Sequence, residues 1–571
     1  MASIAPKKIA GHTYYYAREC KRVDGKPKIV WQRYLGKAED IIAKCARDSS
    51  TPGAVQPMHA ALTDFGAVAA LYDLAERLGI REVIDRHVPK RGSGPSVGTY
   101  LLVATLNRCV APCSKASIAD WFRGTVLRRL VDVDARQLTS QRYWDNMDRV
   151  SKKAIGAIEG DLVQGLVREF DLDLERLLFD ATNFFTFIDT FNERCTLAQR
   201  GKSKEGRASL RIVGLALLVT SDFHVPLLHQ TYPGNQTDAP TFASLIDDLV
   251  TRYRQIIQGT EQVTLIFDKG NNSSDNFDAL EATPYHFIGS LVPTQHPELL
   301  DLSSRSFRSL ARDGLPGVRA CRLQMEVFGA LRTVVVTYNE NLFVAQSRTL
   351  LREIAKRQEQ LHTLQVRLSR WHSGRTTRGK PPTMAGVRKK VAGLLKARHM
   401  KDLFRIDLGE QEGIPSLHYR FDQRAWDKLQ RTLLGKTILF TDNHSWSNAE
   451  IVRGYRSQHH VERAFRDMKD PSLISLRPQF HWTDQKIRVH VFSCVMALTL
   501  CSLLQRELQR LGIDLSIQKM IDQLQKIKEV TVVYPPAGRK KKPIIQTTTS
   551  ELSDLQQSLF DALNLQKHLP S

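Results

Sequence analysis

Two short apolar stretches decide the fold of this 571-residue chain: LLFDATN at residues 177–183 and VTLIFDKG at residues 263–270. Each is a run of β-type residues that ends in an aspartate, Asp180 or Asp268, and then breaks. Such runs are typical of strands buried on both faces of a central sheet, and open α/β sheets place their sites at strand ends. Taken singly, each aspartate is explained more simply as a helix N-cap or a turn former.

A third stretch, YRSQHHVERAFRDMK, begins at Tyr455 and places Glu462 between cations. Tyr455, Glu462 and Lys469 recur every seven residues, and seven steps of about 100° return to within about 20° of the starting direction. One continuous helix would therefore carry all three on one face, with Arg466 one turn beyond Glu462. Residues 447–450, SNAE, have the form of a capping box and predict where the helix begins. The alternative is a solvated amphipathic helix with ordinary salt bridges.

The three acids together indicate a chemistry that none indicates alone. Three carboxylates from separate elements can hold two divalent cations about 3.5–4 Å apart, which serves phosphoryl transfer on nucleic acid. Ligands that are all oxygen favour Mg²⁺, with Mn²⁺ as a possible substitute. Asp180, Asp268 and Glu462 are therefore the candidate catalytic residues and metal ligands.

The order of predicted elements is strand-Asp, hairpin, helix, strand-Asp, strand, long insertion and helix-Glu. This order resembles the RNase H-like core of the DDE transposases of bacterial insertion sequences, over roughly residues 10 to 510. Tyr455, Glu462 and Lys469 resemble the Y-x2-R-x3-E-x6-K signature of one large group of them, although Gln458 stands where the signature has arginine. Further similar positions are PGNQTD at 233–238, FDKGNNS at 267–273, LRP at 476–478, His481, Trp482 and His490.

The resemblance implies an enzyme that cuts and joins DNA at the ends of its own mobile element, acting as a homodimer on terminal inverted repeats and a target. It implies that Tyr455 and Lys469 grip the DNA strand near the scissile phosphate. Gln458 can donate a neutral hydrogen bond to a phosphate but cannot supply the charged bidentate fork of arginine. Arg466 lies about 40° around the helix from Glu462 and is expected to supply the charged phosphate contact that Gln458 cannot make.

The composition agrees with a polyanionic partner. The formal net charge is +22 and the sequence pI is about 9.7, and neutralisation of phosphates by Lys and Arg dominates affinity for nucleic acid. The most apolar segment, residues 489–504, is shorter than a membrane span and is expected to be a buried helix. The start of the chain lacks a signal-peptide pattern, and the eight cysteines form no CxxC pair. A cytoplasmic, nucleoid-associated protein with reduced thiols and no membrane contact is expected.

The predicted architecture is an α/β, RNase H-like mixed-sheet core that is interrupted by a β-rich and helical insertion. An insertion is required because Glu462 follows Asp268 by 194 residues. Residues 12–36 predict a β-hairpin with a Gly-containing turn, and residues 41–60 predict a linker. The expected divisions are an N-terminal hairpin region (residues 1–45), a helical DNA-binding domain (61–167) and the first part of the core (168–300). They continue with the insertion (301–434), the second part of the core with the Glu helix (435–510) and a helical, basic tail (511–571).

The insertion is expected to contact DNA through a basic helical arm. Residues 352–401 hold 14 Lys or Arg against 2 Asp or Glu, an excess that repels itself unless a polyanion lies nearby. Arg388, Lys389 and Lys390 are the candidate contacts. The alternative is an ordinary solvated face.

Two other functions fit the same residues. A cellular nuclease or resolvase on the same fold would use the same three carboxylates, although it has no need of the long insertion. A domesticated, catalytically inactive DNA-binding protein would be compatible with the glutamine at position 458. Strand transfer, hydrolysis alone or binding alone would separate the three possibilities.

Overall fold

A ten-stranded mixed sheet forms the centre of the larger of two units, which comprises residues 82–88 and 147–502. The computed structural model describes residues 2–10, 12–23, 26–47, 56–90, 92–189, 191–206, 209–236, 238–256, 263–375, 379–476, 480–536 and 542–570. The strands of the sheet are β5 (Arg176–Phe185), β6 (Gln199–Arg200), β7 (Arg211–Thr220), β8 (Pro226–Pro233), β9 (Thr264–Ile266), β10 (His286–Leu291), β11 (Arg308–Ser309), β12 (Val318–Val327), β13 (Ala330–Asn339) and β16 (Lys436–Thr441).

Strand β9 is the only described strand of this sheet whose neighbours on both sides run parallel to it. The order is β11-β12-β13-β16-β10-β9-β5-β7-β6, with β8 paired to β7. β9 runs parallel to β5 on one side and to β10 on the other, and every other pair is antiparallel. The predicted strands next to Asp180 and Asp268 are thus confirmed and are neighbours. The expected end of the first strand at Asp180 is wrong, because β5 continues to Phe185 by pairing with β7. The protein is a mixed α/β protein with one large mixed sheet.

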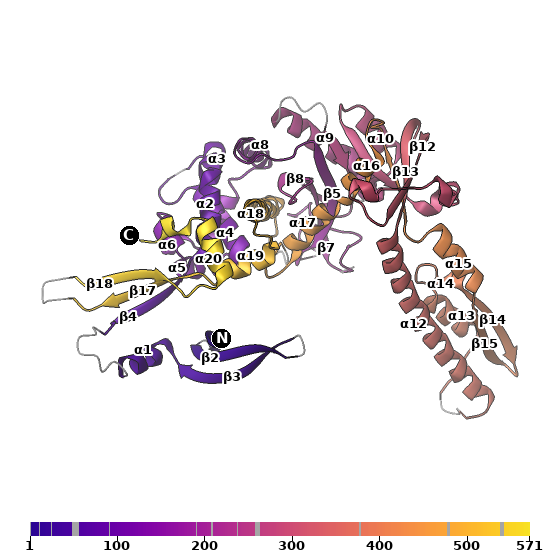
Figure 1. Ribbon diagram of the computed structural model, residues 1–571, viewed down its shortest axis with the longest axis horizontal. Helices are drawn as coiled ribbons and strands as arrows, with labels where there is room; N and C mark the ends of the chain where they lie inside the picture. Colours follow the sequence, from indigo (N-terminus) through magenta and orange to yellow (C-terminus); the bar gives the residue numbers. More distant parts are fainter. Residues whose placement is uncertain are drawn as a thin grey trace. The chain divides into compact units, whose positions relative to one another are not determined.

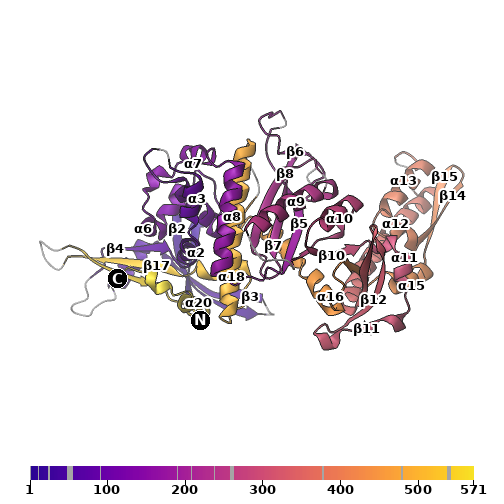
Figure 2. The same cartoon turned by 90° about the horizontal axis from the view of Figure 1, so that it is seen from above.

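The alternation of side chains along β5 separates a core face from a second face. Leu177, Phe179 and Ala181 join the main hydrophobic cluster. Helices α9 (Asp238–Ile256) and α10 (Ser274–Glu281) contribute to the same cluster and lie beside β5 and β8 in Figure 2. The residues between them on β5, including Asp180, therefore face the other side of the sheet. That side is covered by α16 (Asn448–Arg456) and α17 (His459–Lys469), which pack against β10 and β5 respectively.

The insertion lies between β13 and β16 and has its own hydrophobic core. Its elements are α12 (Glu340–His372), α13 (Met384–Leu394), α14 (Met400–Leu403), β14 (Phe404–Gln411), β15 (Ile414–Phe421) and α15 (Gln423–Thr432), seen together in Figure 1. Ile354, Leu361, Leu364 and Leu368 form one buried stripe of α12, as their spacing predicts. The hairpin β12–β13, placed in the insertion by the sequence, instead extends the main sheet through β16.

The second unit comprises residues 1–81, 89–146 and 503–571. Its main helices are α2 (Gly66–Arg77), α4 (Val97–Val110), α5 (Ile118–Arg123), α6 (Leu127–Leu130), α7 (Ser140–Met147), α19 (Ile517–Leu524) and α20 (Asp554–Ala562). α3 (Ile80–His87) belongs partly to each unit. The helical pattern expected between residues 61 and 167 is confirmed, and it ends with α8 (Lys152–Glu169), which lies in the larger unit.

The C-terminal residues do not form a separate tail. Strands β17 (Lys528–Tyr534) and β18 (Ile544–Thr549) form a sheet with β4 (His59–Asp64), and Lys528 Nζ lies 2.6 Å from Asp64 Oδ1. A contact across more than 400 residues leaves no local sequence pattern. The sequence also predicts that the basic run at residues 539–542 binds phosphate or a partner; residues 539–541 of that run lie outside the described residues.

The N-terminal hairpin is confirmed and gains a strand. β2 (His12–Val23) and β3 (Lys26–Gly36) pair antiparallel, and β1 (Ala2–Ile9) pairs with β2. The turn residues Asp24 and Gly25 lie outside the described residues. The expected linker is wrong at both ends, because α1 (Ala38–Arg47) extends into it and β4 begins at its end.

The apolar segment near residue 490 forms the buried helix that the sequence predicts. It belongs to α18 (Asp484–Arg510), which is long and apolar enough to cross a bilayer by length and composition alone. However, 89% of its most apolar window is buried inside the protein. Such burial is typical of the core helix of a globular protein.

The core of the insertion provides a direct test of its packing. Leu361 is fully buried on α12, whereas Leu351 on the same helix is 51% exposed. We expect Leu361→Ala to destabilise the insertion by about 2–5 kcal/mol, because it removes buried methyl groups and leaves a cavity. Leu351→Ala is the matched control and should cost less than about 0.5 kcal/mol. Amide hydrogen exchange of α12 and β15 measures both, and equal protection in the two variants would contradict this packing.

Candidate active site

The pairing of β5 with β9 brings Asp180 level with Asp268. Leu178 pairs with Ile266 in parallel, so the same register two residues further on aligns the two aspartates. Asp268 still has extended backbone, with φ −84° and ψ 157°, although β9 ends at Ile266. Neighbouring strands lie about 4.8 Å apart and alternate residues share a face. Both aspartates therefore lie side by side on the face covered by α16 and α17, and both are partly exposed.

A third strand adds a hydroxyl to the same row. Ile288 on β10 also pairs with Ile266, which places Ser290 level with Asp268. Tyr455, from the last turn of α16, reaches over this row: its Oη lies 2.7 Å from Ser290 Oγ and 3.4 Å from Asp268 Oδ1. The phenol has only one hydrogen to donate. When Tyr455 donates it to Asp268, the Ser290 hydroxyl donates to Tyr455 Oη. Sequence reasoning did not identify Ser290.

Glu462 lies near this row although it comes from a different helix. Burial, together with the negative charges of Asp268 and Glu462, raises the pKa of Tyr455 to about 12. Two carboxylates thus act on one phenol, which stays protonated at neutral pH. Glu462 itself is exposed, in the first turn of α17, and that helix packs against the strand that carries Asp180. The three predicted acids therefore gather in one region of the larger unit.

The prediction of one continuous helix for residues 447–469 is wrong. α16 ends at Arg456 and α17 begins at His459. The capping box of Ser447 and Glu450 is confirmed at the start. At the junction, Gln458 N donates to the carbonyl of Tyr455 at 3.2 Å, a tight i−3 bond in place of i−4. The Ser457 hydroxyl also bonds the carbonyl of Gly454 at 2.6 Å, which competes with the helical pattern.

Lys469 connects the end of α17 to β5 through hydrogen bonds. Its Nζ donates to Thr182 Oγ1 and to the carbonyl of Asn183, both at 2.8 Å, and lies 3.4 Å from Glu205 Oε1. The side chains of Lys469 and Glu205 are only 16% and 14% exposed. These contacts occupy the ammonium that the resemblance assigns to DNA. In this structure Lys469 positions the Glu462 helix on the Asp180 strand.

The loop that carries Lys204 contacts the same part of β5, and the sequence analysis did not identify it. Lys204 Nζ donates to the carbonyl of Ala181 at 2.6 Å, beside Asp180, and Lys204 N donates to Asn183 Oδ1 at 2.9 Å. The loop is seated by backbone contact, because a Cβ on Gly201 would lie 2.3 Å from the carbonyl oxygen of Gly234. Its only sequence signal is the dense run of cations around residues 200–207.

A buried histidine cluster contacts α17 at His460 and at Asp467. His224, in the turn after β7, is 1% exposed, and its ring stacks on that of His460 at 6.1 Å. Its Nε2 lies 3.8 Å from Asp467 Oδ2, and neither ring nitrogen has a hydrogen-bond partner among the described residues. Burial, followed by the nearby charge of His460 and Arg463, lowers the pKa of His224 to about 3. The ring is therefore neutral at physiological pH.

The remaining predicted contact residues differ in exposure. Gln458 is only 7% exposed, which leaves little of it for a phosphate. The Arg466 side chain is 70% exposed and has a loose ion pair with Asp467 at 3.8 Å. Arg388, Lys389 and Lys390 are all exposed on α13, between the buried Val387 and Val391.

The other motif positions support the surroundings of the site. His490 Nε2 lies 3.3 Å from the carbonyl of Leu476, and the rings of His481 and His490 are 4.8 Å apart. These contacts join the segment after α17 to α18. Thr237, Arg477 and Pro478 lie outside the described residues.

The three acids do not form one compact metal-binding cluster. Among the described residues, no three His, Cys, Asp or Glu side chains stand close enough to hold one metal together. Asp180 is the middle acid, since β5 pairs with β9 and also contacts α17. Asp180 could therefore share one ion with Asp268 and another with Glu462. Carboxylate oxygens are the ligands preferred by Mg²⁺ and Mn²⁺, so the donor chemistry fits.

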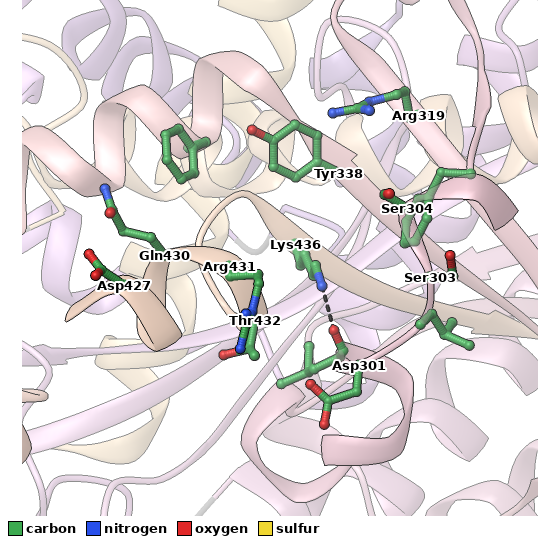
Figure 3. Close-up of a pocket in the computed structure, with 14 residues that line it drawn as sticks. Asp301, Ser303, Ser304, Arg319, Tyr338, Asp427, Gln430, Arg431, Thr432 and Lys436 are labelled. Carbon is green, nitrogen blue, oxygen red and sulfur yellow. Dashed lines mark hydrogen bonds between the residues drawn. The ribbon is translucent and has the colours of Figure 1, made fainter. Parts of the chain in front are cut away.

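A cavity of about 570 Å³ opens beside the acids and reaches the insertion. Lys269, Ser290 and Tyr455 line one side, and Arg398 and His399 are among the residues on the other. None of the three acids lines this cavity, but Ser290 and Tyr455 do. A larger cavity, of about 660 Å³, lies within the insertion region and is lined by neither Ser290 nor Tyr455 (Figure 3). Lys436, whose Nζ donates to the carbonyl of Leu300 at 2.5 Å, lines both cavities. The smaller cavity is the one that belongs to the candidate site.

Comparison with known proteins finds similarity only among solved structures. No family model and no curated protein matches this chain. Among solved structures, the chain is similar to the piggyBac transposase in a synaptic complex with hairpin DNA. The two are 10% identical, the similarity covers 82% of each chain, and the TM-score is 0.33. A similarity of this extent carries no information about activity.

The contacts of Lys469 predict an effect on stability. Lys469→Met removes two hydrogen bonds and leaves Glu205 without this cation, so we expect a loss of about 1–3 kcal/mol. Arg466→Ala, on the same helix but largely exposed, is the control and should change stability by less than about 0.5 kcal/mol. Urea unfolding measures both. Equal midpoints for Lys469→Met and the unchanged protein would show that Lys469 does not fasten the helix.

His224 predicts acid sensitivity. Its folded pKa of about 3 lies below the unfolded value near 6.5, so the unfolded chain binds more protons and stability falls as the pH drops from 6.5 towards 3. Between pH 7 and pH 5 this group should cost about 1–2 kcal/mol. His224→Asn, which tolerates the positive φ of 46° at this position, should flatten the pH dependence. Parallel unfolding profiles for the two proteins would contradict the assignment.

Proposed function

We propose that this chain is a metal-dependent DNA transposase of the DDE type, with an RNase H-like core. The observation that carries the proposal is the convergence of three acids from separate elements. Asp180 and Asp268 stand level on parallel neighbouring strands, and Glu462 stands on the helix fastened to the first of these strands. Acids in this arrangement suit two-ion phosphoryl transfer. The Y-x2-R-x3-E-x6-K group of insertion-sequence transposases is the finer assignment.

The protein's own groups would act mainly by positioning, because phosphoryl transfer leaves little covalent work to the enzyme. Tyr455 donates towards Asp268 and limits how that carboxylate turns. Lys469 holds α17, and with it Glu462, on β5. Lys204, beside Asp180, adds positive charge where a phosphate would approach.

Asp180, Asp268 and Glu462 would hold two Mg²⁺ ions, or Mn²⁺ in their place. When bound, such ions lower the pKa of an attacking hydroxyl and stabilise the leaving oxygen. The three acids offer hard carboxylate oxygens, which suit Mg²⁺ or Mn²⁺ better than the sulfur and imidazole ligands typical of Zn²⁺ sites.

DNA would be held over a wider surface than the acids. The exposed cations nearest the site are Lys269 and Arg466, and Arg466 is the one proposed to replace the missing arginine of the signature. Arg388, Lys389 and Lys390 present three charges from α13. A homodimer that brings two element ends together in the bacterial cytoplasm is the assembly that this function requires.

The experiment combines the purified chain with labelled DNA that flanks its reading frame, a target plasmid and Mg²⁺. Joined products indicate a transposase. Nicks without joining indicate a nuclease or resolvase, and a shifted but uncut band indicates an inactive DNA-binding protein.

Isosteric changes to the acids test the assignment. Asp180→Asn, Asp268→Asn and Glu462→Gln should each lower cleavage by at least about a hundredfold while DNA binding persists, because each removes a metal ligand but few DNA contacts. Asp442→Asn is the matched control: Asp442 also follows a strand, but it bonds His286 and Phe287 N towards the other end of β10. A variant of the three acids that keeps more than a few per cent of wild-type cleavage would remove that residue from the site.

A further inference from the structure

The N-terminal sheet of β1, β2 and β3 has almost no core of its own. Among its described side chains and glycines, only Ala5 and Gly36 are buried. Large apolar residues are left open: Ile4 is 62% exposed, Trp31 48% and Ile29 50%. A small sheet gains little stability unless one of its faces is covered. The exposed residues therefore indicate that a partner covers one face of this sheet.

The strand register divides the sheet into two different faces. Ala5, Tyr16 and Tyr34 pair across the three strands on one face, where the rings of Tyr16 and Tyr34 lie 5.2 Å apart. Tyr14 adds a second contact to Tyr34 at 6.1 Å, so this face partly covers itself.

The opposite face, called here the Trp31 face, holds Ile4, Lys8, Trp31 and Arg33. Ile4 and Arg33 both pair with Ala17, and Lys8 and Trp31 share their side of the sheet by alternation. All four side chains are exposed. One acid, the half-buried Glu19, accompanies them among the described residues.

The charge of residues 1–37 indicates what kind of partner the sheet binds. Residues 1–37 contain nine Lys or Arg and two Asp or Glu. Such an excess favours a polyanion. The exposed apolar residues alternate with cations, so the face lacks the continuous apolar stripe that buries itself in a lipid interface. A two-stranded ribbon also fits the major groove of DNA, which is about 12 Å wide.

We propose that the Trp31 face binds duplex DNA in the major groove. Lys8 and Arg33 contact phosphates and guanine edges, and Ile4 and Trp31 pack against sugars and thymine methyl groups. The identity of this DNA as the end of a mobile element depends on the proposed function. The binding of duplex DNA by this face does not depend on it.

Two adjacent lysines on β1 give a matched test in the full-length chain. Lys8 lies on the Trp31 face and Lys7 on the tyrosine face, so Lys8→Glu and Lys7→Glu change the charge equally at neighbouring positions. We expect Lys8→Glu to weaken binding of the flanking DNA duplex about tenfold and to reduce the salt slope by about one or two units. Lys7→Glu should weaken binding less than about threefold. Trp31→Ala should weaken binding of the duplex about fivefold with an unchanged salt slope.

Equal losses for the two lysine variants would overturn the proposal, since they would mean that only the general charge matters. Tight binding to anionic phospholipid vesicles in preference to the duplex would overturn it also, as would a Trp31-dependent dimer that binds DNA unchanged. Unfolding midpoints check that both variants fold. Asp180→Asn should abolish cleavage while duplex binding through the Trp31 face persists, whereas Lys8→Glu should weaken duplex binding itself, so failure of this inference is distinguishable from failure of the proposed chemistry. If the unchanged protein binds the duplex through this face but never cuts, the proposed function fails and this inference stands.

Discussion

The parallel pairing of β5 with β9 is the constraint on which the candidate site depends. It sets Asp180 level with Asp268, and because side chains alternate along a strand, a slip of one residue would turn one of these acids into the hydrophobic core. The core prevents that slip, since Leu177, Phe179, Leu265 and Phe267 must all face α9 and α10. Burial of the apolar residues on one face therefore determines where the acids stand on the other. The second parallel pairing, with β10, extends the row to Ser290 in the same way.

The helix that carries Glu462 is held on this face by two sets of contacts. Lys469 bonds β5 beyond Asp180, while His460 and Asp467 meet the buried His224 in the turn after β7. Together these contacts leave the helix little freedom to move along the strand. The tight turn between α16 and α17 lets Tyr455 reach Asp268 from one helix while Glu462 approaches from the next. The insertion, which has its own core, can differ in sequence without disturbing this arrangement.

The sequence predicted those features that are written in local patterns. Apolar runs that end in aspartate predicted β5 and β9, the capping box predicted the start of α16, and the leucine spacing predicted the buried face of α12. Features that depend on distant contacts escaped it. The pairing of β17 with β4 and the contact of Lys204 with β5 leave no periodic signal, and the i−3 turn at Gln458 arises from side-chain hydrogen bonds that a helical wheel does not include. The resemblance assigned Lys469 to DNA, whereas in the structure its ammonium bonds Thr182 and Asn183.

Cleavage of the protein by radicals generated at its own metal site tests the central claim, the convergence of the three acids, most directly. Fe²⁺ would replace Mg²⁺ in the purified chain, and ascorbate with peroxide would produce hydroxyl radicals that cut only backbone close to the bound ion. The account predicts cuts in three segments, around Asp180, Asp268 and Glu462, that excess Mg²⁺ suppresses. Cuts confined to one of these segments, or cuts at unrelated acidic positions, would contradict it.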